Sequence, residues 1–179
     1  NEKVSITENL DSVIVQKEVE LAKIENELNA LAFKISKNRL KSIPGLAKQL
    51  EALLSILGMP NARFNVELSP AHTFLTNGKD DLKFLFSANK GGQFNELKKA
   101  ASGGELSRIM LAIKSILTNY TQLPTIMFDE IDTGVSGEIS NKMASIMQQM
   151  SKTMQVFTIT HLPQIAAKGG THFKVFKED

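Results

Sequence analysis

The chain lacks cysteine altogether, which excludes disulfide bonds and thiolate chemistry and suits a reducing cytoplasm. It also lacks an excess of one charge, because 21 basic and 19 acidic side chains give a formal net charge of +2. Global electrostatic attraction to nucleic acid is therefore not expected, and any DNA contact must be local. No apolar run is long enough to span a bilayer, and no charged-then-apolar leader is present. We expect a soluble, cytoplasmic protein with no membrane partner.

The length of 179 residues is enough for one ordinary domain and an appendage. The sequence starts at Asn1 instead of methionine and enters a helical pattern almost at once. We therefore expect a fragment of a longer protein.

A heptad pattern occupies the first part of the chain, interrupted only by a lysine. Its positions, spaced alternately by four and three residues, are Leu10, Ile14, Lys17, Leu21, Ile24, Leu28, Leu31 and Ile35. Such a repeat predicts a coiled-coil helix with a partner, and residues 8–40 would extend roughly 50 Å at about 1.5 Å per residue. An amphipathic helix lying on the domain's own core is the alternative.

The triplet Ile43-Pro44-Gly45 is predicted to break this helix, with a short amphipathic helix over 46–57. We place the domain boundary here, with a coiled-coil segment over 1–42 and a globular domain over 43–179. Alternating residues at 64–68 and 82–86 predict two half-exposed strands, which could form a hairpin arm around Asn77-Gly78.

The last third of the chain predicts a βαβ unit. Apolar runs at 126–128 and 156–159, without alternation, favour strands buried on both faces of a parallel sheet, and the methionines of the helix between them are expected in the core. Residues 172–176 could add an edge strand. Because parallel strands joined by a crossover helix end at the same edge, Asp129-Glu130 and His161 should converge there.

A helix start is predicted at Ser102-Gly-Gly-Glu-Leu-Ser-Arg108. Ser102 can cap this helix and Glu105 can close a capping box, while Gly103 and Gly104 leave the first N–H groups uncovered. Unpaired amides and the helix dipole attract anions such as phosphate. Each motif by itself also has an ordinary interpretation. The motif at Ser102 could be a simple helix start, Asp129-Glu130 could be an acidic turn, and His161 could be a loop residue. His72 and His172 stand at no metal-ligand spacing and are assigned no site.

In this order the motifs resemble the C-terminal half of an ABC-type ATPase head, with a signature loop, a Walker B strand, a D-loop and an H-loop histidine. The amino-acid sequences of residues 99–114, 128–137 and 159–167 resemble those of the RecN family, which are bacterial SMC-like DNA-repair proteins. The resemblance is strong over roughly the last half of the chain. The fold class it implies is α/β, the C-terminal lobe of an ABC/SMC-type P-loop ATPase head with an N-terminal coiled-coil helix.

The resemblance implies ATP and Mg²⁺ as cofactors. Asp129 would hold Mg²⁺ through water, since Mg²⁺ keeps most of its hydration shell. Glu130 would polarise the attacking water, and His161 would hydrogen-bond that water or the γ-phosphate.

No Gly-x-x-x-x-Gly-Lys-[Ser/Thr] phosphate loop occurs in the sequence. The chain therefore lacks the main cradle for the β- and γ-phosphates and should not hydrolyse ATP by itself. The resemblance implies that an N-terminal lobe of the same protein carries this loop and is joined through a coiled-coil hairpin.

In the family two heads sandwich two nucleotides. The resemblance casts Ser102, Gly103, Gly104 and Glu105 as contacts to the nucleotide of the partner head, and Asp132 as the D-loop residue. It further implies ATP-driven homodimers of heads, DNA as a partner in double-strand-break repair and recombination, and association with the bacterial nucleoid.

Two rival functions remain open. Asp129, Glu130 and Asp132 could form a Mg²⁺-dependent nuclease or topoisomerase-like site, or the heptads could make the chain a structural dimerisation module.

Overall fold

The computed structural model describes residues 2–177, without the side chains of residues 2–11, 98 and 100. The chain divides into two compact units. The first combines Asn1–Ile43 with Leu68–Leu82, and the second combines Pro44–Glu67 with Lys83–Asp179.

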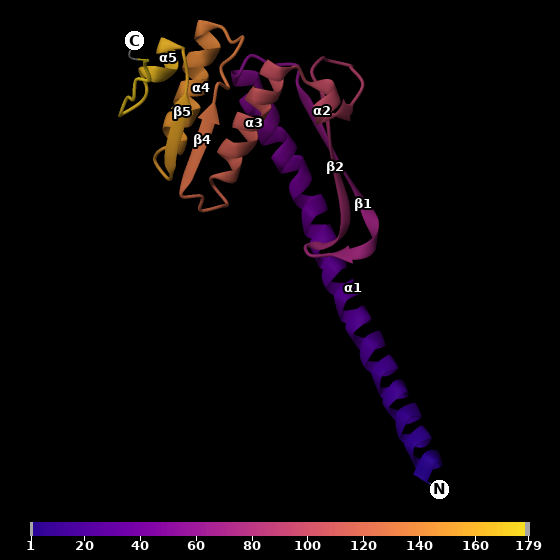
Figure 1. Ribbon diagram of the computed structural model, residues 1–179. Helices are drawn as coiled ribbons and strands as arrows, with labels where there is room; N and C mark the ends of the chain where they lie inside the picture. The colour runs from indigo at the N-terminus through magenta and orange to yellow at the C-terminus, as the bar shows by residue number, and fades with distance from the viewer. Residues whose placement is uncertain (1, 178–179) are drawn as a thin grey trace. The chain divides into compact units, whose positions relative to one another are not determined.

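Helix α1 (Glu2–Ile56) is uninterrupted and supplies residues to both units (Figure 1). The predicted break at residues 43–45 is wrong, because Pro44 lies inside the helix. A proline there removes one hydrogen bond and costs about 3 kcal/mol. The turns after it bury Leu50 and Leu54 almost completely, and each fully buried leucine contributes about 1.5–3 kcal/mol, which offsets that cost.

The heptad stripe is exposed along α1. The apolar seam residues are between 37% and 57% exposed, namely Ile14, Leu21, Ile24, Leu28, Leu31 and Ile35. The alternative of a helix lying on the domain's own core is therefore wrong for these residues. The first seam position, Leu10, lies outside the described side chains.

Strands β1 (Arg63–Leu75) and β2 (Gly78–Ser87) are hydrogen-bonded neighbours joined across Thr76-Asn77, which confirms the hairpin. Both are longer than predicted. Pro70 fits within β1 because β1 is an edge strand, where a missing N–H is tolerated. The short strand β3 (Asn95–Glu96), antiparallel to β2, and helix α2 (Leu97–Ala100) were not predicted.

The second unit has one continuous core. The end of α1, the base of the hairpin, helix α3 (Gly103–Leu117) and helix α4 (Gly137–Met150) supply its fully buried side chains. Phe64 and Phe86 pack with their ring centroids 5.3 Å apart. The methionines of α4 are core residues, as predicted; Met143, Met147 and Met150 are buried.

Strands β4 (Thr125–Asp129) and β5 (Gln155–Ile159) pair in parallel on either side of α4 in the sequence, which confirms the βαβ unit. The expectation that both strand faces are buried is wrong. Phe128 packs into the core, whereas Met127 is 63% and Ile159 51% exposed. No described segment covers this second face, because α4 packs only on the face that carries Phe128 and Thr158.

The segment after β5 forms only a short helix, α5 (Pro163–Ala166). The predicted strand at 172–176 is wrong, since these residues pair with no strand in the described chain and Val175 is 96% exposed. No helix in the described part of the chain is long and apolar enough to cross a membrane.

Candidate functional site

The carboxyl ends of β4 and β5 bring the acid pair and the histidine to one edge. The two strands lie side by side and run in the same direction (Figure 1). Asp129 is the last residue of β4 and pairs in register with Ile159, the last residue of β5. Glu130 directly follows the first strand, and His161 follows the second by two residues. The predicted convergence at one sheet edge is therefore confirmed, and all three ionisable side chains are exposed to incoming ligands.

Glu130 has an unusual backbone. Its φ is 45°, and among the described residues it is the only non-glycine residue with a positive φ. This conformation costs energy for a residue with a side chain, and it is enriched at active sites. Its N–H still donates to the carbonyl of Ile159 at 3.1 Å, and its own carbonyl accepts the Thr133 hydroxyl at 3.0 Å. The sharp turn after β4 is thus fixed to β5. Sequence reasoning missed this feature.

Asp132 is tied to the histidine loop. Its side chain is 1% exposed and accepts a short hydrogen bond from the Thr160 hydroxyl. The Thr160 hydroxyl oxygen in turn accepts from the backbone N–H of Leu162 at 3.0 Å, so these two contacts bracket His161. The other carboxylate oxygen of Asp132 has no partner among the described residues. The sequence analysis does not predict this role of Thr160. The signal in the sequence is a hydroxyl residue directly before the histidine that follows β5.

Helix α3 begins as predicted. Ser102 is its N-cap, and a full capping box is present: the Ser102 N–H donates to the Glu105 carboxylate at 2.8 Å, and the Glu105 N–H donates to the Ser102 hydroxyl oxygen at 3.4 Å. The Ser102 hydroxyl also donates to this carboxylate, at 2.9 Å. Ser102 and Gly103 are exposed, and the N–H groups of Gly103 and Gly104 bond to nothing in the described chain. This end can therefore accept an anion.

The start of α3 lies beside the turn that follows the acid pair. A Cβ atom on Gly104 would sit 3.4 Å from the carbonyl oxygen of Thr133. The predicted signature residues and the loop after β4 are thus neighbours within one chain.

The side chains present fit a magnesium nucleotide only in part. Asp129 offers the oxygen ligand that Mg²⁺ prefers, and the open end of α3 offers N–H groups to phosphate. The described residues contain no group of three or more His, Asp or Glu side chains that could hold a metal. A Mg²⁺ ion at Asp129 would therefore need phosphate oxygens and water to complete its coordination.

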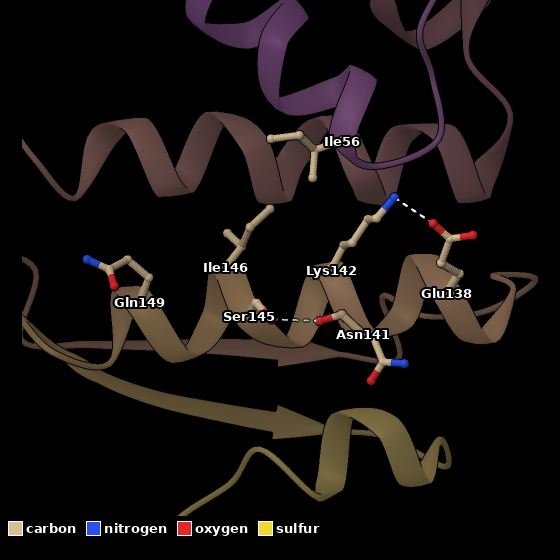
Figure 2. Close-up of a pocket in the computed structure, with 7 residues that line it drawn as sticks. All are labelled: Ile56, Glu138, Asn141, Lys142, Ser145, Ile146 and Gln149. Carbon is tan, nitrogen blue, oxygen red and sulfur yellow. Dashed lines mark hydrogen bonds and ion pairs between the residues drawn. The ribbon is translucent and has the colours of Figure 1, made fainter.

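A separate pocket of about 390 Å³ lies along α4, where Ile56 faces Ile146 (Figure 2). At its rim Lys142 pairs with Glu138 at 2.8 Å. The pKa of Glu138 lies below its ordinary value, mainly because of this hydrogen bond and secondly because of the positive charge of Lys142. None of the predicted site residues lines the pocket.

The sequence is similar to curated DNA-repair proteins. It is 39% identical over 154 residues to DNA repair protein RecN of Rickettsia prowazekii, covering 86% of this chain and 28% of that protein. It is 36% identical over 192 residues to the RecN protein of Bacillus subtilis, covering 99% of this chain and 33% of that one. The chain thus spans about a third or less of these relatives. No family model matches it.

The fold is that of SMC heads. The Smc head domain with a coiled coil and joint from Pyrococcus yayanosii superimposes with a TM-score of 0.63 at 20% identity, over 90% of this chain and 30% of that one. An SMC ATPase structure described for ATP-driven dimerisation and DNA-stimulated activation superimposes with a TM-score of 0.52 at 19% identity, over 80% and 84% of the two chains. The long helix α1 and the parallel strands are thus parts of a known α/β architecture. By its sequence the chain belongs to the RecN family.

Proposed function

We propose that this chain is the C-terminal lobe of a RecN-type ATPase head together with a stub of its coiled coil. It would bind and hydrolyse ATP only with an N-terminal lobe of the same protein, which would carry the phosphate loop absent here. ATP binding would close pairs of heads into a homodimer and hydrolysis would open them. The whole protein would act on DNA in double-strand-break repair and recombination, in the cytoplasm and at the nucleoid.

The observation that supports this proposal best is the shared edge of Asp129, Glu130 and His161. Asp129 would bind a hydrated Mg²⁺, whose charge would stabilise the triphosphate. Glu130 would take the proton of the attacking water, a general-base role worth about 10²- to 10⁴-fold in rate. His161 would hydrogen-bond the γ-phosphate or that water, held in place by the contacts of Thr160 on either side of it.

The start of α3 would complete the site of the opposite head. Ser102, Gly103 and Gly104 would donate to the γ-phosphate that the partner head holds. Glu105 already accepts both donors of Ser102, so a phosphate would have to compete with this carboxylate for the serine hydroxyl. Asp132 would be the D-loop residue that links the two nucleotide sites, and its hydrogen bond with Thr160 ties it to the histidine loop of its own head.

The test uses the protein with both lobes and the substitution Glu130→Gln. We expect ATP-dependent dimers to persist in analytical ultracentrifugation while phosphate release falls at least a hundredfold. Glu67→Gln, the same chemical change at an exposed position on β1, serves as the control and should leave turnover unchanged. Unchanged turnover in Glu130→Gln would remove that residue from the base role.

The nuclease alternative is disfavoured by Asp132. A two- or three-carboxylate metal site needs open oxygen ligands, whereas this side chain is 1% exposed and its bonded oxygen is occupied by Thr160. Cleavage of DNA by the purified chain with Mg²⁺ and no nucleotide would reinstate the nuclease. The dimerisation-module alternative would gain if removal of residues 1–40 abolished self-association of the two-lobe protein with ATP.

A further inference from the structure

The loop that follows β4 and the segment that follows β5 are tied together at two points. The loop leads from Asp132 to Gly137, where α4 begins, and the segment leads from Thr160 to Gln164, within α5. At the first point the Thr160 hydroxyl donates to the buried carboxylate of Asp132. At the second point the side-chain amide of Gln164 packs against Gly137, since a Cβ atom on that glycine would lie 3.3 Å from its Nε2 atom. We call these two contacts the loop clamp.

His161 lies between the two contacts of the loop clamp. The N–H of its neighbour Leu162 donates to the Thr160 hydroxyl oxygen at 3.0 Å, and Leu162 is the N-cap of α5, which buries Ile165 in the core. The imidazole of His161 is exposed and forms no hydrogen bond within the described chain. The position of this ring therefore depends on the backbone that the loop clamp fixes.

Packing stability alone does not explain the polar side chains of the loop clamp. Gln164 buries its Oε1 atom, and Asp132 buries one carboxylate oxygen, without a hydrogen-bond partner among the described residues. A buried acceptor without a donor lowers stability, so an apolar side chain of similar length at position 164 would serve the fold better. Buried polar groups that are kept against such a cost are expected at functional sites.

We propose that Thr160 and Gln164 are positioning residues for ATP hydrolysis, which hold His161 at the sheet edge by tying its segment to the loop of Asp132. The inference rests on the proposed role of His161 and deepens it by naming the side chains on which that role depends. A misplacement of about 1 Å can cost about a hundredfold in rate, so a small shift of this segment is enough to slow hydrolysis.

The test measures steady-state ATP hydrolysis by the protein with both lobes. Gln164→Met keeps the length of the side chain and removes the amide. We expect kcat to fall about tenfold to a hundredfold with little change in KM for ATP, because the contact is lost in the transition state and the substituted residue does not touch the nucleotide. In urea denaturation the same variant of the 179-residue chain should be no less stable, since it loses a buried acceptor without a donor.

Substitutions at Thr160 provide a second measurement. Thr160→Val removes the hydroxyl and should lower kcat by a similar factor, whereas Thr160→Ser keeps the hydroxyl and should retain most of the turnover. The controls carry the same chemical changes away from the loop clamp. They are Gln148→Met on the exposed side of α4 and Thr153→Val just before β5, and both should leave kcat unchanged.

Each substitution is then repeated in a His161→Ala protein. If Thr160 and Gln164 act through His161, their substitutions should lower turnover no further in that background, whereas a general loss of folded protein would lower it in both. Unchanged kcat in Gln164→Met, an equal loss in the His161→Ala background, or an equal loss in the controls would each overturn the proposal.

Failure of this inference is distinguishable from failure of the proposed function. A fall in kcat for His161→Ala with unchanged kcat for Gln164→Met would overturn the loop clamp alone. Unchanged kcat for His161→Ala would overturn the role proposed for His161, and the positioning role of the loop clamp with it.

Discussion

Replacing Thr160 by valine should destabilise the second unit, because it leaves a buried carboxylate without its donor. Valine keeps the shape of threonine but removes the hydroxyl that donates to Asp132, a side chain that is 1% exposed. A hydrogen bond to a charged group contributes about 1.5–3 kcal/mol, and loss of the acceptor for the Leu162 N–H adds about 0.5–1.5 kcal/mol. The expected loss is therefore about 2–4.5 kcal/mol, a large fraction of the usual free energy of unfolding of about 5–15 kcal/mol.

Urea denaturation followed by circular dichroism gives this quantity as a shift of midpoint at constant slope. Thr160→Ser keeps the hydroxyl and should cost less than about 1 kcal/mol, for the lost methyl group. In a double-mutant cycle with Asp132→Ala, the two residues should couple by more than about 1 kcal/mol. A valine variant no less stable than the serine variant would refute the reasoning, since it would mean that water or another donor serves the carboxylate.

Three further changes test other parts of the chain. Ser102→Ala removes the N-cap and should cost about 1 kcal/mol in urea denaturation, whereas Ser102→Thr should cost little; an equal loss would contradict the capping role. Gly58→Ala should destabilise by more than about 1 kcal/mol, because Gly58 has φ of +80° and the new Cβ would lie 2.4 Å from Cδ1 of Ile139; adding Ile139→Val should recover part of the loss, and no recovery would exclude the clash as its cause. Lys142→Met should raise the pKa of Glu138 towards its ordinary value in an NMR titration; because that pKa is lowered in the folded chain, the small stabilisation exists above the unfolded pKa and disappears as pH falls through the folded one, and an unmoved titration would refute the pairing.

Features fixed by short-range chemistry were predictable from the sequence. The capping box at Ser102 depends on two side chains three residues apart. The meeting of Asp129 with the histidine loop follows from the parallel direction of the two strands, whose carboxyl ends share one edge. Features fixed by distant packing were not. Pro44 remains helical because leucines further along the helix are buried, and nothing within a few residues of it reveals this.

Burial was predicted least well where it depends on segments outside the pattern itself. The apolar runs of β4 and β5 predict strands buried on both faces, although only one face is covered within the described chain. The bond between Asp132 and Thr160 joins residues 28 positions apart, and no local motif announces it. The positive φ of Glu130 belongs to the turn after β4, which a backbone hydrogen bond to Ile159 ties to β5, and no local motif announces it either.

The uncovered face of the parallel strands affects how the chain behaves in solution. Met127 lies directly beside Phe157 in the strand register, and both side chains are exposed together with Ile159. These side chains form an exposed apolar patch. Sulfate and similar salts strengthen apolar association, so concentrated samples should cluster as such salts are added and disperse on dilution. A charged residue placed at Met127 should therefore reduce this association and keep the isolated chain dispersed at higher concentration.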